Sequence, residues 1–313
     1  MRIGIFTGPQ GIAWSDLRDA WLHADAARYD SAWLWDHLVA LHGDLDDAHF
    51  EGWTLLAALA TITEHVTIGH LVTANTFRHP ALLAKMAATV DHTSNGRLVV
   101  GIGTGYYAEE HDRYGIPLPS KADRAEMLAE SVQILRGLWT EPRFSFQGRF
   151  YTMTDAPAEP KPLQKPWPPI LFGGAGVRLM RNTARYADRW DLPDGAAGVT
   201  PEHFRAKLEL LHGYCEEIGR DPSEITTSTS LAPIVDRDPA RVRERFERLK
   251  AFRGWDEETT QRHTLAGSPD EVLEQLGRWE AAGVDELLLT LVPGVNYGDL
   301  ETFTTEVLPN VRR

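Results

Sequence analysis

The chain has 313 residues, of which 42% are hydrophobic and 25% are charged, so a disordered or fibrous protein is excluded. Asp and Glu number 45 against 32 Lys and Arg, and the net charge of −13 argues against broad binding to nucleic acid or to an anionic membrane. The single cysteine, Cys215, excludes an internal disulfide and favours a reducing compartment. Because no apolar run reaches the roughly 18 residues of a membrane span and no secretory leader opens the chain, we expect a cytoplasmic protein.

Short apolar runs rich in β-branched residues alternate with longer amphipathic segments along nearly the whole chain, which is typical of a parallel sheet with crossover helices. The predicted strands are residues 3–7, 32–35, 66–72, 98–102, 170–172, 187–192, 224–235 and 286–292. The predicted helices are a first one capped at Ser15–Asp16, then 53–63, 81–92, 122–139, one carrying Leu179 and Met180, then 202–218, 239–252 and 269–282. The remaining predicted features are an irregular stretch at 36–50, a hairpin at 144–151 turning at Gln147–Gly148, and a proline-rich strap at 156–169.

Eight strand–helix units in a chain of this length match an eight-stranded parallel barrel better than a doubly wound open sheet, which is the alternative. We therefore expect one α/β domain over residues 1–313, a TIM (β/α)8 barrel with insertions. In such barrels the chemistry lies where strands end and helices begin, so the residues just after each predicted strand are the candidates for a site.

Polar side chains follow the second and third predicted strands. Asp36 and His37 come directly after the second strand, and a carboxylate next to an imidazole suits proton transfer, with a loop cap by Asp36 as the alternative. The stretch 73–80 after the third strand is rich in hydrogen-bonding side chains and closes with Pro80 at an expected helix start, although an ordinary loop has the same composition.

Glycine-rich segments follow the fourth and fifth predicted strands. Gly103 and Gly105 permit close approach of the backbone to a ligand, and Tyr106 or Tyr107 offers a ring to flank a planar group. The glycines of residues 173–176 open a helix, whose backbone amides form a natural phosphate cradle, with tight turns as the alternative. Together the two segments predict a phosphate-bearing cofactor across the barrel top. The dinucleotide fingerprint is excluded because Tyr106 stands where its third glycine belongs.

Motifs of serine hydrolases, zinc proteases and P-loop nucleotide binders are missing from the sequence. The acidic stretch 44–51 lacks the glycine spacing of a calcium loop. His42, Asp46, Asp47 and His49 have the side chains to hold a metal, but a solvated loop is the favoured interpretation. We expect no metal site.

The order and spacing of these motifs resemble the luciferase-like monooxygenase superfamily and, within it, the oxidoreductases that use the deazaflavin coenzyme F420. The resemblance covers residues 1–189, extends more loosely over the C-terminal third, and rests on residues 30–37, 73–80, 95–105 and 172–174. It implies a TIM barrel with a flavin-type cofactor at its carboxyl-terminal mouth. It also implies that His37 lies by the reactive ring carbon, with Asp36 as its acidic neighbour.

The resemblance further implies where the cofactor binds. A non-prolyl cis peptide forms a bulge behind the ring in this family, and by position it is Leu71–Val72. The other cofactor-binding positions are Thr73, Asn75, Gly103, Gly105, Tyr106, Gly173, Gly174 and Ala175. The chain departs from the sugar-phosphate dehydrogenases of this branch, which carry a glutamate in place of Tyr106 and a tryptophan in place of Leu41. Oxidation of a sugar phosphate is therefore not implied.

The expected reaction is hydride transfer between F420 and a small organic substrate with an activated C=C, C=N or carbonyl group. His37 would give or take the accompanying proton and Asp36 would orient it. Glu51 is a candidate second acid–base group, with a carboxylate at a helix start as the alternative.

Two other functions remain open at this point. An FMN-dependent monooxygenase would receive reduced flavin from a partner reductase, and a non-catalytic flavin-binding protein would hold the cofactor without turnover. The resemblance also implies a homodimer, packed through helices near the second and third strands. Local positive charge for the acidic tail of F420 would come from Arg78, Arg113, Lys121 and Arg178.

Overall fold

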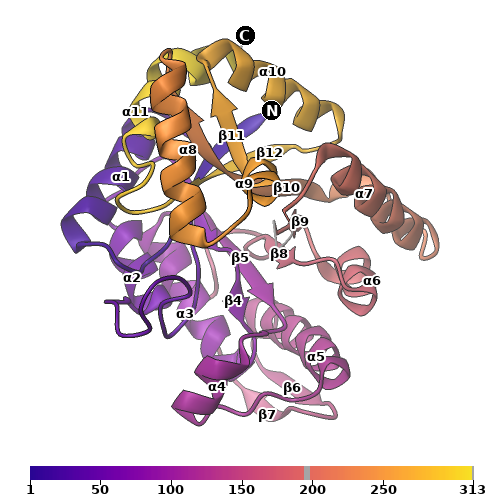
Figure 1. Cartoon of the computed structure of the whole chain (residues 1–313). Helices are drawn as coiled ribbons and strands as arrows, with labels where there is room; N and C mark the ends of the chain where they lie inside the picture. Colours follow the sequence, from indigo (N-terminus) through magenta and orange to yellow (C-terminus); the bar gives the residue numbers. More distant parts are fainter. Residues whose placement is uncertain (194–197, 312–313) are drawn as a thin grey trace.

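The computed structural model describes residues 1–193 and 198–311. Eight parallel strands form a closed barrel surrounded by helices (Figure 1), and the expected TIM barrel is confirmed. The barrel strands are β1 (Arg2–Thr7), β2 (Ser31–Leu34), β3 (Thr67–His70), β5 (Leu98–Gly103), β8 (Ile170–Gly173), β9 (Arg189–Leu192), β10 (Thr226–Val235) and β12 (Glu286–Leu291). Each pairs with the next along the barrel, and the circle closes because β9 pairs with β10 and β12 with β1.

The helices follow the strands in the expected alternation. They are α1 (Trp14–Ala26), α2 (Gly52–Ala60), α3 (Pro80–Thr93), α4 (Ala108–Tyr114), α5 (Lys121–Thr140), α6 (Val177–Tyr186), α7 (Pro201–Glu216), α8 (Pro239–Arg253), α9 (Glu257–Arg262), α10 (Pro269–Ala281), α11 (Asp299–Thr302) and α12 (Leu308–Val311), with a π-helical turn at Phe303–Val307. None of the helices in the described ranges is long and apolar enough to cross a membrane.

The apolar core has two layers. Trp33, Val99, Leu171 and Leu288 come from different strands and fill the barrel interior. A larger cluster lies between the strands and the helices and contains fully buried side chains such as Trp21 and Phe172. Because the strands are covered on both faces, they read as continuous apolar runs rather than alternating ones.

Additional elements leave the barrel at several points. They are the short strand β4 (Thr73–Ala74), which pairs with the end of β5, the hairpin β6 (Phe144–Gln147) and β7 (Thr152–Ala156), and β11 (Thr264–Gly267). The first half of β10 pairs within the barrel, whereas its last residues pair with β11. Helix α4 and the hairpin lie at the opposite side of the molecule from the two termini (Figure 1).

Some predicted boundaries were wrong. Helix α1 begins at Trp14 after an uncapped Ala13, because the carbonyl of Ala13 already accepts the amides of Asp16 and Leu17, so Ser15 is not its cap. Helix α4, helix α9 and strand β11 were not predicted, because each is four to seven residues long and too short for a periodic apolar pattern. The strap after β7 is confirmed and is fastened to α3 by Gln164, whose amide donates to Asp91 over 2.7 Å.

Candidate active site

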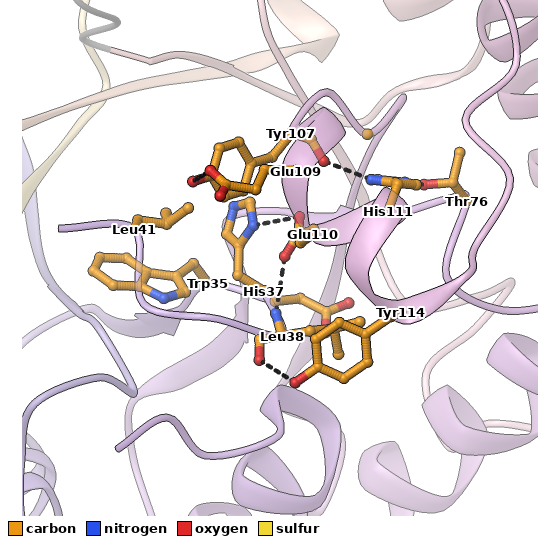
Figure 2. Close-up of polar contacts among 12 residues, drawn as sticks. Trp35, His37, Leu38, Leu41, Thr76, Tyr107, Glu109, Glu110, His111 and Tyr114 are labelled. Carbon is orange, nitrogen blue, oxygen red and sulfur yellow. Dashed lines mark hydrogen bonds and ion pairs between the residues drawn. The ribbon is translucent and has the colours of Figure 1, made fainter. Parts of the chain in front are cut away.

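The candidate site lies at the carboxyl ends of β2, β5 and β8. His37 follows β2 and is 9% exposed. Its Nδ1 lies 2.8 Å from Oε1 of Glu110, and the Leu38 amide donates to Oε2 of the same carboxylate over 3.0 Å (Figure 2). Glu110 is 1% exposed. Each oxygen of this buried carboxylate contacts the turn that carries His37.

Glu110 belongs to α4, and this short helix is fastened to two loops of the barrel mouth. Helix α4 ends at Gly115, whose φ of 66° is the left-handed conformation that favours glycine. The Tyr114 hydroxyl donates to the Leu38 carbonyl over 3.0 Å (Figure 2). On the other side, the ring of His111 lies 2.7 Å from the Thr76 hydroxyl. Helix α4 thus connects the loop after β2 to the loop after β4.

The tautomer of His111 follows from its two partners. Its Nδ1 lies 2.7 Å from the carbonyl oxygen of Tyr107, and a carbonyl can only accept, so Nδ1 carries the hydrogen. In the neutral ring Nε2 then accepts, and the hydroxyl of Thr76 is the donor. His111 is fully buried, so this arrangement stabilises the base of α4 without solvent.

The expectation that Asp36 orients His37 is wrong. Asp36 is fully buried and its carboxylate is bound by both terminal nitrogens of Arg78, one of them at 3.1 Å. Adjacent side chains of an extended chain point to opposite sides, so neighbours in sequence need not touch. Asp36 and Arg78 therefore stabilise the loop behind His37 while Glu110 contacts its ring.

Glu51 caps a helix, as the alternative interpretation held. Its carboxylate accepts from the amides of Trp53 at 3.2 Å and Thr54 at 2.6 Å, at the start of α2. A third contact of 3.5 Å joins it to Arg78. Its contacts place it in the Asp36–Arg78 group and not beside His37.

The expected cis peptide is present between Leu71 and Val72. The side chain of Val72 lies against two glycines: a Cβ added to Gly103 would lie 2.6 Å from its Cγ2, and one added to Gly173 would lie 3.0 Å from its Cγ1. Larger residues at the ends of β5 and β8 would collide with the bulge, which explains why both positions are glycine.

The other expected cofactor residues surround the same opening. The hydroxyl of Thr73 accepts a hydrogen bond from the indole of Trp53 over 2.9 Å. The backbone amide of Asn75 donates to the Gly103 carbonyl over 3.0 Å, and its side-chain carboxamide is buried. Gly105 has a φ of 74°, and its carbonyl accepts from the guanidinium of Arg124.

Tyr106 is 67% exposed, and its ring meets that of His37 edge-on at a centroid distance of 5.7 Å. The ring of Tyr107 lies 6.3 Å from His37 on a similar edge-on geometry. The two tyrosine rings lie 6.3 Å from each other, so both contact the imidazole from one side.

The segment after β8 leads into a helix without a side-chain cap. Gly174 has a φ of 126°, and its carbonyl accepts from the indole of Trp190 over 2.8 Å. Ala175 and Gly176 follow, and no side chain caps the first turn of α6. Its orphan amides and the helix dipole favour an anion there.

Two histidines of the long loop 36–50 stay neutral in the folded protein. Burial, with a contribution from Arg253, lowers the pKa of His42 to about 4. Burial and the neighbouring His37 lower the pKa of His49 to about 4. In the described part of the chain, no three His, Cys, Asp or Glu side chains gather in a way that could hold a metal.

Sequence reasoning missed Glu110, which makes the most direct contact with His37. The run Glu109-Glu110-His111-Asp112 is strongly charged and predicts a solvated segment. A weak signal was available, because Glu110 and Tyr114 are four residues apart and so share one face of a helix, as do Tyr107 and His111.

A closed parallel barrel with an imidazole and glycine-lined strand ends at its carboxyl-terminal mouth is the arrangement of a luciferase-like barrel enzyme. Residues 1–259 match the family model described as luciferase-like monooxygenase, and the chain belongs to that family.

Named relatives include two kinds of redox enzyme. The chain is 27% identical to an F420-dependent glucose-6-phosphate dehydrogenase of Microbacterium testaceum (strain StLB037), over 100% of this chain and 98% of the relative. It is 28% identical to an FMNH(2)-dependent dimethylsulfone monooxygenase of Pseudomonas putida, over 85% of this chain and 80% of that protein. The solved structure of an F420-dependent secondary alcohol dehydrogenase in complex with an F420-acetone adduct is 24% identical, with a TM-score of 0.84 over 100% of this chain and 99% of that one.

Proposed function

We propose that this protein is an F420-dependent oxidoreductase that transfers a hydride between the deazaflavin and a small organic substrate. The observation that carries the proposal is His37, a histidine braced by a buried carboxylate and lying next to the rings of Tyr106 and Tyr107 at the mouth of the barrel. Hydride transfer to a carbonyl, or from an alcohol, requires a proton at the substrate oxygen, and a braced imidazole is suited to handle it. The two F420-dependent relatives support the same cofactor.

The residues at the mouth fit a planar ring with a phosphate-bearing tail. The bulge at Leu71–Val72, the buried carboxamide of Asn75 and the backbone at Gly105 would hold the ring. The amides between Gly174 and the first turn of α6 would hold the phosphate. When bound, F420 supplies a ring carbon that gives or takes a hydride.

The charges near the mouth divide into two groups. Arg78 and Arg113 were expected to offset the acidic tail, but Arg78 is paired with Asp36 and Arg113 with Glu109 at 2.8 Å. Lys121 and Arg178 are exposed in the first turns of α5 and α6. We therefore assign the tail to the side of the mouth where these two helices begin.

The protein's own residues then have separate tasks. His37 exchanges a proton with the substrate oxygen, and Tyr106 and Tyr107 contact its ring edge-on. Asp36 and Arg78 hold the loop in place, because their buried ion pair lies directly behind the turn. The substrate would be a small molecule with a carbonyl, C=N or activated C=C group, bound at the mouth next to His37.

An FMN-dependent monooxygenase is the second candidate, because the Pseudomonas putida relative uses reduced FMN. Titrating the purified protein with F420 and, separately, with FMN at fixed salt distinguishes the two through ligand fluorescence. We expect F420 to bind at micromolar concentration or tighter and FMN to bind weakly. The reverse preference would assign the chain to the monooxygenases and call for a partner reductase and oxygen-uptake assays.

Two variants at one position test where the phosphate binds. A Cβ on Gly176 would meet nothing within 4 Å, so substitutions there fit the fold. Gly176→Asp places a carboxylate at the start of α6 and should weaken F420 binding by about tenfold or more, since like charges near a helix N-terminus compete. Gly176→Ser caps the helix without the charge and is the matched control. Equal affinity for both variants would refute the phosphate assignment.

Turnover separates an enzyme from a flavin-binding protein without catalysis. With F420 bound, we expect reduction of the cofactor by secondary alcohols or its reoxidation by ketones, and loss of that activity in His37→Ala. Cofactor binding without turnover of any carbonyl or alcohol would favour the binding protein.

We also expect a homodimer packed through α2 and α3, which light scattering of the purified protein checks.

A further inference from the structure

We propose that Glu110 is the positioning residue that fixes which nitrogen of His37 exchanges the proton. Its carboxylate accepts the hydrogen on Nδ1, so Nε2 is the atom that faces the substrate. The proposal rests on the proposed role of His37 as the proton handler, and it adds a tautomer, an acting atom and a residue that sets both.

The hydrogen-bond pattern requires two acceptors at Glu110. The Leu38 amide can only donate, and it donates to Oε2 over 3.0 Å. Oε1 lies 2.8 Å from Nδ1 of His37. An ionised carboxylate satisfies both donors at once, and its charge strengthens both bonds. The neutral imidazole is thereby held with its hydrogen on Nδ1 and a lone pair on Nε2.

The carboxylate cannot move away from this position without breaking other contacts. Its side chain is 1% exposed. Its helix is fastened on one side by the bond from Tyr114 to the Leu38 carbonyl and on the other by the bond between His111 and Thr76. Figure 2 shows Glu110 and Tyr114 pointing from α4 toward the turn of His37 and Leu38, and His111 pointing toward Thr76. The partner of Nδ1 is therefore rigid, as a positioning group must be.

The other side of the ring is open to a ligand. Nε2 of His37 has no hydrogen-bond partner in the described part of the chain, and it is not one of the fully buried unpaired atoms. The rings of Tyr106 and Tyr107 contact the imidazole edge-on, at centroid distances of 5.7 and 6.3 Å. Nε2 is thus the nitrogen that can receive a proton from an alcohol or return one to a ketone.

The isosteric variant Glu110→Gln should invert the tautomer without changing the shape of the site. A glutamine amide has one acceptor and one donor group. Its oxygen would accept from the Leu38 amide, and its NH2 group would donate to Nδ1 of His37. Nδ1 then becomes the acceptor, and the hydrogen moves to Nε2. A serine protease whose triad aspartate is changed to asparagine loses activity through the same kind of tautomer change.

The test is ¹⁵N NMR of the imidazole rings in the protein without cofactor, at about pH 8, above the range in which histidines ordinarily titrate. The signals of His37 are assigned by comparison with His37→Gln. We expect the hydrogen on Nδ1 in the wild type and on Nε2 in Glu110→Gln. Glu109→Gln is the matched control, because Glu109 lies on the same helix, is 43% exposed and contacts Tyr107 and Arg113 instead. Its spectrum of His37 should equal that of the wild type.

Kinetics give the second readout in the enzyme loaded with F420. We expect Glu110→Gln to lower kcat by about 10²- to 10⁴-fold with little change in KM or in cofactor affinity, because only the proton-transfer atom changes. Glu109→Gln should stay within about twofold of the wild type.

The outcomes separate this proposal from the proposed function. A wild-type His37 with its hydrogen on Nε2 overturns the proposal even if Glu110→Gln does not fold. An unchanged tautomer in a folded Glu110→Gln overturns it as well. If neither F420 nor FMN supports turnover, the proposed function fails, while the NMR comparison still decides the role of Glu110.

Discussion

Replacing Arg78 by methionine tests whether the buried ion pair behind His37 holds the loop in place. The side chain of Asp36 is 0% exposed and that of Arg78 is 9% exposed, and two guanidinium nitrogens bind the carboxylate. Methionine fills part of the volume but leaves Asp36 as a buried charge without its partner. Breaking a buried pair in this way costs about 3–5 kcal/mol, which is a large share of the roughly 5–15 kcal/mol that stabilises a domain.

The assay is urea unfolding followed by circular dichroism and tryptophan fluorescence. We expect Arg78→Met to lose about 3–5 kcal/mol of unfolding free energy. The double variant Asp36→Asn with Arg78→Met should recover much of the loss, because no charge remains buried. Arg278→Met is the surface control: its partner Glu274 and Arg278 itself are 68% and 65% exposed, so the loss should stay below about 0.5 kcal/mol.

A loss of less than about 1 kcal/mol of unfolding free energy in Arg78→Met would contradict the reasoning, since a buried carboxylate without a partner destabilises a protein by more than that. Equal losses in the single and the double variant would also contradict it. That pattern would mean that Arg78 stabilises the loop by packing and not by its charge.

Three further predictions address backbone packing and pH. In Gly101→Ala the new Cβ would lie 1.8 Å from the carbonyl oxygen of His70, so β3 must shift, and we expect a loss of at least about 1–3 kcal/mol in urea unfolding. In Gly277→Ala the new Cβ meets nothing within 4 Å on α10, and removing a helical glycine should stabilise the protein by about 0.5–1 kcal/mol; a loss there would argue against the helix. His42 and His49 have pKa values of about 4 in the fold against an ordinary 6.5. The unfolded chain therefore binds protons that the folded one does not, and stability should fall as the pH drops from 7 to 5, by up to about 1.4 kcal/mol per pH unit for each histidine. His49→Gln should reduce this slope, and a urea midpoint that is constant over this range would refute the assignment.

The barrel could be predicted because its evidence is local. Each buried strand leaves a run of apolar residues and each helix leaves a periodic face, and both patterns survive in the sequence without knowledge of the contacts. The ends of β5 and β8 were recognisable for a similar reason. The backbone there lies too close to Val72 for a larger residue, and the glycines that this requires, Gly103 and Gly173, are visible in the sequence. Short elements such as α4 were missed because seven residues carry no reliable period.

The contacts of acidic side chains were harder to predict than the fold. Asp36 stands next to His37 in the sequence, yet it pairs with Arg78, 42 residues further along. Glu110 lies 73 residues from His37 and makes the contact that Asp36 was expected to make. A short charged segment looks the same in the sequence whether its side chains are solvated or buried against a partner. The pairing of charged residues therefore does not appear in a local pattern.

The sequence by itself thus determined the fold class, because it depends on periodicity and on the order of strands, and it predicted a site around His37 at the carboxyl-terminal end of the barrel. Only the tertiary structure decided which carboxylate braces that histidine, which one caps α2 and which one is neutralised by Arg78. Those assignments depend on distances between segments far apart in the chain, and such distances exist only once the barrel has closed.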